Sequence, residues 1–293
     1  MLEEYPSGGA GESLLEIRGI CVSYSPSKAQ PVRALDGVSL EVRSGEIIGL
    51  LGESGCGKST LANSVIQSLP SNAKIESGEI VFKGRNLLNL RERELTSIRG
   101  REISLVPQDP ALSLNPVMAV GTQISEVLRA HLPLRATQRR ERVHELLQEM
   151  GFERPSEIYH AYAHQLSGGQ RQRIVIAQAI SCGPALLIAD EATSKLDASL
   201  QLEIVEYLSA IRKRHGTAMI IITHDPMLLA GFADRIAVMY GGQIVELGKC
   251  ADMMERPLHP YTQALMRVAK SSSIADVSKK KRFPTINREL LPV

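Results

Sequence analysis

Tryptophan is absent from this sequence, and the aromatic residues Phe, Tyr and Trp make up only 4% of it. So few aromatic side chains offer little surface on which the bases of a single-stranded nucleic acid would stack. The charges are balanced, with 34 Lys and Arg against 32 Asp and Glu and a formal net charge of +2. This balance argues against a protein that coats a polyanion. We therefore expect no nucleic-acid partner.

Cysteine is scarce as well. The four residues Cys21, Cys56, Cys182 and Cys250 lie far apart and form no Cys-x-x-Cys pair. This spacing argues against a zinc ribbon, a redox dithiol motif and a disulfide scaffold.

Long hydrophobic runs are also missing. A helix that spans a bilayer needs about 18 consecutive apolar residues, whereas the apolar stretch at residues 218–222 has the length of a buried strand. The first residues, Met-Leu-Glu-Glu-Tyr, have neither the basic nor the apolar region of a secretory signal. We expect a cytoplasmic protein whose membrane role, if it has one, comes from a partner.

The sequence nevertheless contains enough apolar residues for a sizeable core: 43% of its 293 residues are hydrophobic, and its length suits about two domains. Residues 1–13 are rich in Gly, Ser and Glu and predict a flexible lead-in. Short apolar alternations over residues 14–42 predict two or three antiparallel strands. Charged, helix-patterned sequence from about 110 to 180 predicts a helical insert.

The remaining pattern is that of a parallel α/β unit. Residues 46–51 form a continuous apolar run that ends in a glycine cluster, and Leu61, Val65, Ile66 and Leu69 follow at helical spacing. Two further apolar runs, at 185–189 and 218–222, have the character of buried parallel strands. The Gly-Gly between residues 236–240 and 243–246 predicts a hairpin.

The glycine cluster carries the strongest chemical signal. Residues 52–59, Gly-Glu-Ser-Gly-Cys-Gly-Lys-Ser, match the phosphate-binding pattern G-x-x-x-x-G-K-[ST] between a strand and a helix. The glycines let backbone N–H groups point at phosphate oxygens, Lys58 adds a positive charge, and the Ser59 hydroxyl is a ligand for Mg²⁺. The predicted nucleotide-binding residues of this segment are Gly52, Ser54, Gly55, Cys56, Gly57, Lys58, Ser59 and Thr60.

Two carboxylates, Asp190 and Glu191, follow the predicted strand at 185–189. The carboxyl ends of parallel strands are where such sheets bind ligands. Asp190 there is suited to holding Mg²⁺, and Glu191 to polarising an attacking water. Taken alone, the pair has a simpler interpretation as a cap for a following helix.

A second glycine motif, Leu-Ser-Gly-Gly-Gln, occupies residues 166–170 at the start of a predicted helix. Such a helix N-terminus is an anion site, although a plain N-cap is an equally good interpretation of the motif alone. With a phosphate-binding loop about 110 residues before it and an acidic pair about 20 after it, the sequence resembles the ATP-binding subunit of an ABC transporter. The resemblance extends from about residue 14 to residue 270.

The resemblance implies an α/β fold with a P-loop NTPase core, an antiparallel β subdomain and an inserted α-helical subdomain. It also implies that two ATPase chains sandwich ATP between the P-loop of one and the signature residues Ser167, Gly168, Gly169 and Gln170 of the other. ATP hydrolysis with Mg²⁺ is the implied reaction.

Four further residues match the family residue by residue. Tyr24 resembles the aromatic residue that stacks on adenine, and Gln108 the glutamine that contacts Mg²⁺ and water and senses the membrane partner. Asp197 resembles the aspartate of the inter-subunit loop, and His224 the histidine that contacts the γ-phosphate. Alternatively, Tyr24 is an ordinary strand aromatic, Gln108 a polar loop residue, Asp197 a helix cap and His224 a strand-end histidine.

Two short stretches of sequence indicate one branch of this family. Residues 108–116, Gln-Asp-Pro-Ala-Leu-Ser-Leu-Asn-Pro, resemble a loop of dipeptide, oligopeptide and nickel importers, and residues 259–265, His-Pro-Tyr-Thr-Gln-Ala-Leu, resemble their C-terminal extension. This implies a nucleotide-binding domain over 14–250 and an extension over 251–293.

We expect an ATPase that energises a peptide importer from the cytoplasmic face of the membrane. Its expected partners are permease subunits, a second ATPase subunit and, indirectly, an extracellular binding protein. A nickel or metal-chelate importer, a soluble ABC ATPase and an ATP-dependent regulatory module are the alternatives.

Overall fold

The structure, a computed structural model, describes residues 12–25, 30–194 and 196–273. Most of the predicted lead-in at 1–13 and residues 274–293 of the predicted extension therefore lie outside the described residues. Within the described ranges, no helix combines the length and the apolar character that a membrane span requires.

The first sheet is antiparallel, as the apolar alternation over residues 14–42 predicts. Its strands lie in the order β2-β1-β4-β5. Residues 14–42 form two long strands rather than three short ones, because register shifts between Ile17 and Val22 let β1 bend without ending. The four strands are β1 (Ser13–Tyr24), β2 (Val32–Arg43), β4 (Ala73–Phe82) and β5 (Arg85–Asn86).

The second sheet has six strands in the order β10-β9-β3-β8-β7-β6 and is parallel except for β10. Its strands include the three predicted apolar runs, and β9 and β10 pair as the predicted hairpin. The strands are β3 (Ile47–Leu51), β6 (Ile103–Val106), β7 (Leu186–Asp190), β8 (Ala218–Thr223), β9 (Arg235–Tyr240) and β10 (Gln243–Lys249).

Helix α1 (Lys58–Val65) follows β3 and ends one turn earlier than the spacing of Leu69 suggests, so that part of the helix prediction is wrong. The chain leaves the helix at Gln67, whose φ is +51°. The Ser68 N–H donates to the Asn63 carbonyl and the Gln67 N–H to the Ser64 carbonyl. These two bonds satisfy the last carbonyls of the helix and stop it from continuing.

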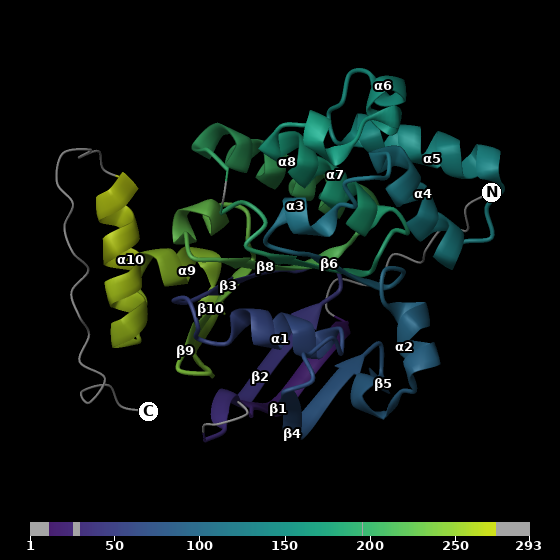
Figure 1. Cartoon of the computed structure of the whole chain (residues 1–293). Helices are drawn as coiled ribbons and strands as arrows, with labels where there is room; N and C mark the ends of the chain where they lie inside the picture. Colours follow the sequence, from purple (N-terminus) through teal and green to yellow (C-terminus); the bar gives the residue numbers. More distant parts are fainter. Residues whose placement is uncertain (1–11, 26–29, 195, 274–293) are drawn as a thin grey trace.

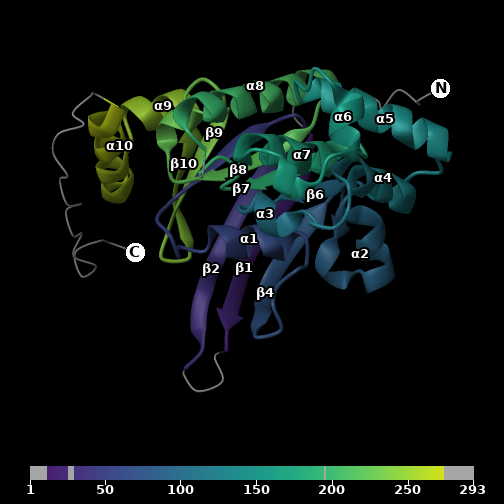
Figure 2. The ribbon, with the colours of Figure 1, turned by 45° about the horizontal axis from the view of Figure 1, so that its top comes forward.

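The segment from 110 to 180 contains only helices, turns and loops, and it lies on the far side of the central sheet from β1 and β2 (Figures 1 and 2). Its helices are α3 (Pro110–Ser113), α4 (Val120–His131), α5 (Ala136–Glu149), α6 (Pro155–His160), the 3₁₀ turn η2 (Ala163–Gln165) and α7 (Gly168–Ile180). The other helical elements are η1 (Leu87–Asn89), α2 (Glu92–Ile98), α8 (Ala198–His215), η3 (Pro226–Leu229), α9 (Cys250–Glu255) and α10 (Pro260–Ser273).

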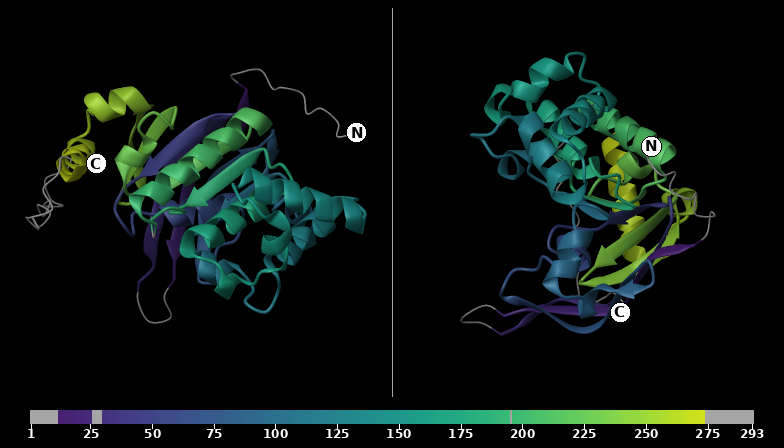
Figure 3. Two further views of the ribbon diagram at one scale, coloured as in Figure 1. Left: turned by 90° about the horizontal axis from the view of Figure 1, so that it is seen from above. Right: turned by 90° about the vertical axis from the view of Figure 1, so that its right-hand side faces the viewer.

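The central sheet divides two hydrophobic cores. Along β3, Ile48 and Leu50 face the antiparallel sheet and α1, whereas Ile47 and Leu51 face the helices. All four are almost fully buried, because successive side chains of a strand point to opposite faces and both faces are covered here. Helix α10 lies at one end of the molecule, opposite α5 (Figure 3).

Candidate functional site

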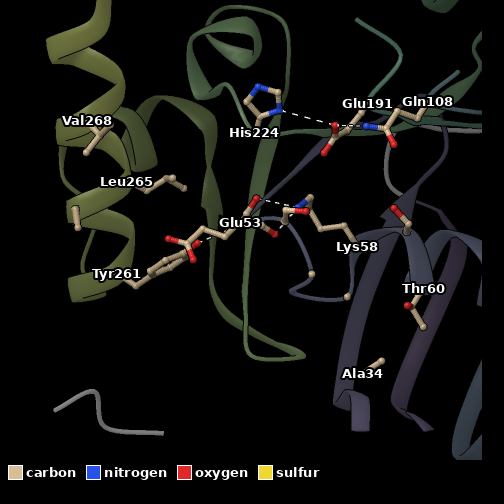
Figure 4. A pocket seen from close by; sticks show the side chains of 16 residues that line it. Ala34, Glu53, Lys58, Thr60, Gln108, Glu191, His224, Tyr261, Leu265 and Val268 are labelled. Carbon is tan, nitrogen blue, oxygen red and sulfur yellow. Dashed lines mark hydrogen bonds and ion pairs between the residues drawn. The ribbon is translucent and has the colours of Figure 1, made fainter. Parts of the chain in front are cut away.

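The carboxyl ends of β3, β7 and β8 meet at one edge of the central sheet, because these strands are parallel neighbours. The glycine loop follows β3, the acidic pair ends β7, and His224 follows β8. Three motifs far apart in the sequence therefore surround one cavity (Figure 4).

The glycine loop needs glycine for steric reasons. Gly52 and Gly57 have φ values of +153° and +109°, which L-residues rarely adopt. A Cβ atom on Gly52 would lie 2.3 Å from the Met239 carbonyl oxygen, and one on Gly57 would lie 2.6 Å from the Ala34 carbonyl oxygen. Only glycine lets the loop wrap this closely against β2 and β9.

Lys58 is the first residue of α1, and its side chain is only 5% exposed. The Nζ atom donates to the carbonyl oxygens of Gly52 and Glu53, both at 2.8 Å. The ammonium group therefore lies inside the loop, next to the N-terminus of a helix. A positive charge and free helix N–H groups together favour a phosphate.

Glu191 has a backbone conformation that is unusual for a residue with a side chain, with φ at +47°. Its N–H donates to the Ile222 carbonyl at 3.0 Å, which holds the residue against β8. Its Oε2 atom accepts a hydrogen bond from Gln108 Nε2 at 2.7 Å and lies 3.9 Å from His224 Nδ1. Such strain at a carboxylate that faces a cavity is typical of a functional position.

Asp190 lies beside Glu191 but deeper. Its Oδ1 atom is buried and has no hydrogen-bond partner among the described residues. Burial is the main cause that raises the pKa of this carboxyl, and the Glu191 carboxylate adds to it, against the opposing effects of Ser59 and Lys58. An unpaired buried carboxylate oxygen next to a hydroxyl is suited to a hard cation.

The cavity has a volume of about 540 Å³. It is lined by most of the residues predicted from the sequence: Gly52, Ser54, Gly55, Gly57, Lys58, Ser59, Thr60, Gln108, Glu191 and His224. Tyr24 is not part of the lining, but its hydroxyl is 3.2 Å from Thr60 Oγ1, so it lies beside the cavity. The Cys56 thiol is buried under the loop, and burial raises its pKa.

The signature residues do not reach the cavity of their own chain. Ser167 caps α7, and its hydroxyl accepts the Gln170 N–H at 3.2 Å while Gln170 Oε1 accepts the Ser167 N–H at 2.9 Å. Gly168 and Gly169 form the first turn of that helix. Asp197 caps α8 by accepting the Leu200 N–H at 3.0 Å, and hydrogen bonds at this cap, first of all from Ser199, lower its pKa. Within one chain, the capping interpretations of both motifs therefore hold.

One wall of the cavity is not predicted by the sequence motifs. Helix α10 contributes Tyr261, Ala264, Leu265 and Val268 to the lining. The string at 259–265 is singled out only by its resemblance, and no spacing rule relates it to a loop more than 200 residues earlier. The i, i+3, i+4, i+7 spacing of these four side chains indicates one helix face, but not what that face covers.

Comparisons with known proteins agree with this geometry. Residues 35–194 match the family described as "ABC transporter", and residues 245–290 match "Oligopeptide/dipeptide transporter, C-terminal region". A "Probable peptide ABC transporter ATP-binding protein" of Sinorhizobium fredii is 42% identical over 261 residues, which cover 89% of this chain and 78% of that protein. An "Oligopeptide transport ATP-binding protein" of Bacillus subtilis is 42% identical over 255 residues, covering 87% and 77%.

A solved structure described as the dimeric, post-hydrolysis state of an ATP-binding cassette bound to ADP and Pi superposes on this chain with a TM-score of 0.73. It has 27% sequence identity and covers 81% of this chain and 99% of that one. The P-loop core, the antiparallel sheet and the inserted helices predicted from the sequence are therefore confirmed as an ABC ATPase fold. The chain belongs to the ABC transporter family, as an ATP-binding and ATP-hydrolysing protein with the C-terminal region of the oligopeptide/dipeptide transporters.

Proposed function

We propose that this protein energises the import of dipeptides or oligopeptides across a membrane. The match of residues 245–290 to the C-terminal region of oligopeptide/dipeptide transporters carries this proposal. The names of the relatives support it, since they are called peptide, oligopeptide or dipeptide transport ATP-binding proteins. Nickel or metal-chelate import is the second candidate, because the string at 108–116 resembles both groups of importers.

We assign ATP to the 540 Å³ cavity. Lys58 and the N–H groups of the glycine loop hold the phosphates, and Tyr24 stacks on the adenine. His224 contacts the γ-phosphate from the end of β8. The buried Lys58 and the exposed loop residues Ser54 and Gly55, which line the cavity before a helix N-terminus, support this assignment, because a positive charge and a helix N-terminus favour a bound anion.

We assign Mg²⁺ to Ser59, Gln108 and Asp190. The buried Asp190 Oδ1 atom, which has no hydrogen-bond partner within the described part of the chain, supports this assignment, and the hydroxyl, amide and carboxylate oxygens of these residues are ligands that Mg²⁺ prefers. The ion, when bound, neutralises negative charge on the phosphates.

We assign the activation of the attacking water to Glu191. A base for this reaction orients the water and withdraws a proton as the γ-phosphate is transferred, and no covalent nucleophile is needed. The Glu191 carboxylate faces the cavity, and the Gln108 amide orients it from one side by the bond to Oε2.

We propose that hydrolysis requires two ATPase chains, identical or different, arranged head to tail. The signature residues of a second chain, corresponding to 167–170, would close the cavity over the γ-phosphate, and its counterpart of Asp197 would lie at the interface. The dimeric description of the structural neighbours supports this arrangement. At the N-terminus of α7, Ser167 is the cap and Gly168 has no side chain. This end of the helix therefore leaves space for a phosphate bound by the other chain.

We expect the permease subunits in the membrane to bind on the side of the molecule formed by the helices of residues 110–180. A second cavity of about 310 Å³ is lined by residues of β6, α3, α4 and α7 and by the turn after α2, among them Arg99, Leu105, Ser113 and Val127. Leu112, which precedes the lining residue Ser113 in the sequence, and Val117 are 88% and 82% exposed. Exposed apolar residues next to a groove favour a protein partner. We therefore propose that a short helix of a permease subunit binds here, and that the protein works at the cytoplasmic face of the membrane.

The cargo is tested by uptake in a strain that lacks the gene. Uptake of labelled dipeptides or oligopeptides should be lost, and it should return with the wild-type gene but not with Glu191→Gln. Loss of nickel or metal-chelate uptake alone would favour the second candidate. A defect confined to sugars would contradict both.

A further inference from the structure

Helix α10 of the C-terminal extension contacts the phosphate-binding loop directly. The Tyr261 hydroxyl accepts a hydrogen bond from the Glu53 N–H at 3.0 Å, across 208 positions of sequence (Figure 4). The Tyr261 side chain is only 2% exposed and packs against the Tyr240 ring, with 4.6 Å between the ring centroids. Burial raises the pKa of Tyr261 to about 12, so the hydroxyl stays neutral at physiological pH.

Glu53 links this contact to Lys58, the lysine to which we assign the phosphates. Its N–H donates to Tyr261, and its carbonyl oxygen accepts from Lys58 Nζ at 2.8 Å. The same carbonyl accepts the Cys56 N–H at 3.3 Å, which shapes the turn of the loop. The orientation of the peptide groups on either side of Glu53 therefore affects both the loop and the lysine.

The start of α10 is held in a defined position. The Glu246 carboxylate of β10 accepts the backbone N–H groups of Leu258 at 2.7 Å and His259 at 3.0 Å. His259 Nδ1 in turn accepts the Tyr261 N–H at 3.2 Å, and Pro260 begins the helix. The three residues of the His-Pro-Tyr string thus act differently: His259 caps the helix, Pro260 starts it, and Tyr261 contacts the loop.

We propose that Tyr261 is a positioning residue for ATP binding, through which the C-terminal extension sets the geometry of the phosphate-binding loop. The hydroxyl fixes the Glu53 N–H, and Glu246 and His259 fix the helix that presents the hydroxyl. A shift of α10 would therefore lower the affinity for ATP through the Glu53 N–H, although no residue of the phosphate-binding loop is replaced. This inference depends on the proposal that residues 52–59 hold the phosphates.

The test is Tyr261→Phe, which keeps the buried ring and removes only the acceptor for the Glu53 N–H. The matched control is Tyr240→Phe, which removes the other hydroxyl of the ring pair. We expect Tyr261→Phe to raise the KM for ATP about three- to tenfold in the assembled transporter, with kcat changed less than twofold, because one intramolecular hydrogen bond is lost. Amide hydrogen exchange of the peptide that contains Glu53 should become faster in the same variant.

Glu246→Ala provides an independent variant, since it removes the acceptor for the Leu258 and His259 N–H groups without changing the ring pair. It should raise the KM in the same direction. A role of Tyr261 in packing alone predicts that Tyr261→Phe matches the wild type in KM and in hydrogen exchange, and this result would overturn the proposal. Lys58→Ala distinguishes the role of the loop in binding phosphate from the role of Tyr261. If Lys58→Ala keeps full ATP affinity, the loop assignment fails; if it loses affinity while Tyr261→Phe is unchanged, only the role of Tyr261 fails.

Discussion

Gln108 and Glu191 lie 83 positions apart in the sequence and are joined by a hydrogen bond of 2.7 Å between Gln108 Nε2 and Glu191 Oε2. Their strands, β6 and β7, are parallel neighbours, so their carboxyl ends bring the two side chains together. Gln108 also begins the segment that leads through α3 to Ser113 in the lining of the second cavity. A displacement of this segment therefore acts directly on the carboxylate to which we assign the base.

Replacing Glu191 by Gln should slow ATP hydrolysis about 10²- to 10⁴-fold, because the shape of the side chain is kept and the base is removed. ATP binding should survive, so the variant should accumulate as an ATP-loaded dimer, alone or with a second ATPase chain. Single-turnover hydrolysis in the assembled complex and size-exclusion chromatography with Mg-ATP measure the two effects. Glu206→Gln, at an exposed position of α8, is the control. Hydrolysis by Glu191→Gln at the wild-type rate would refute the assignment.

Replacing Lys58 by Ala should weaken ATP binding roughly ten- to a hundredfold, since it removes a charged hydrogen-bond donor from the cavity. Equilibrium binding of a fluorescent ATP analogue measures this loss, and the ATP-dependent dimer should disappear with it. Lys74→Ala removes an exposed lysine from β4 and should bind ATP normally. Equal affinities for the two variants would mean that Lys58 does not hold the phosphates.

Replacing Asp190 by Asn should have opposite effects on stability and on function. The pKa of this carboxyl is raised in the folded protein, mainly by burial. The folded state therefore binds the proton more tightly than the unfolded state, and stability is lost as the pH rises from the ordinary Asp value of 3.8 through the raised one. At pH 7 the buried, ionised Asp190 carboxylate destabilises the folded state. Asn carries no charge and removes this destabilisation, so the nucleotide-free variant should melt at a higher temperature than the wild type.

The same variant should lose Mg²⁺-dependent ATP binding by roughly tenfold or more, because a ligand of the ion is replaced. Thermal melts at pH 7 and near pH 4 test the stability effect, since the difference between variant and wild type should shrink at the lower pH. Asp252→Asn, at an exposed position of α9, should change neither property. A lower melting temperature at pH 7 for Asp190→Asn would contradict the prediction.

Filling the second cavity should uncouple transport from ATP binding. Ser113 lines it, and its hydroxyl donates to the Asp109 carbonyl at 2.7 Å. Ser113→Trp should lower uptake at least tenfold and weaken co-purification with the permease, while ATP affinity stays within twofold. Ser113→Ala loses the same hydrogen bond without adding bulk and should transport normally. Normal co-purification with the permease and normal uptake by Ser113→Trp would show that the permease does not dock in this cavity.

Asn115, in the same loop, is less suitable for this test. Its side chain accepts the Val117 N–H at 3.0 Å, and Gln123 holds both its N–H and its carbonyl oxygen. Substitution there would disturb the loop itself, so a loss of transport would not identify a docking surface.

The local sequence was sufficient to predict the strands and turns whose pattern depends on neighbouring residues. The apolar runs became β3, β7 and β8, and the Gly-Gly pair became the turn between β9 and β10. The same patterns did not predict where α1 ends, because Leu69 keeps the helical spacing while Gln67 leaves the helical conformation. The spacing of apolar side chains shows which residues can share a helix face. It does not show at which residue the backbone hydrogen bonds of the helix end.

The sequence by itself determined which motifs supply the site: the loop at 52–59 by its phosphate-binding pattern, the acidic pair by its place at the end of an apolar strand, and His224 by the resemblance to the family. The tertiary structure alone decided which of these groups meet and what else joins them. It brought Gln108 into hydrogen-bond contact with Glu191 and Tyr261 of α10 into contact with the Glu53 N–H. It also left Asp190 Oδ1 with no hydrogen-bond partner among the residues that the structure describes. The reason is that these contacts depend on the order of the strands in the central sheet and on where β10 directs the chain, and neither is encoded within any one motif.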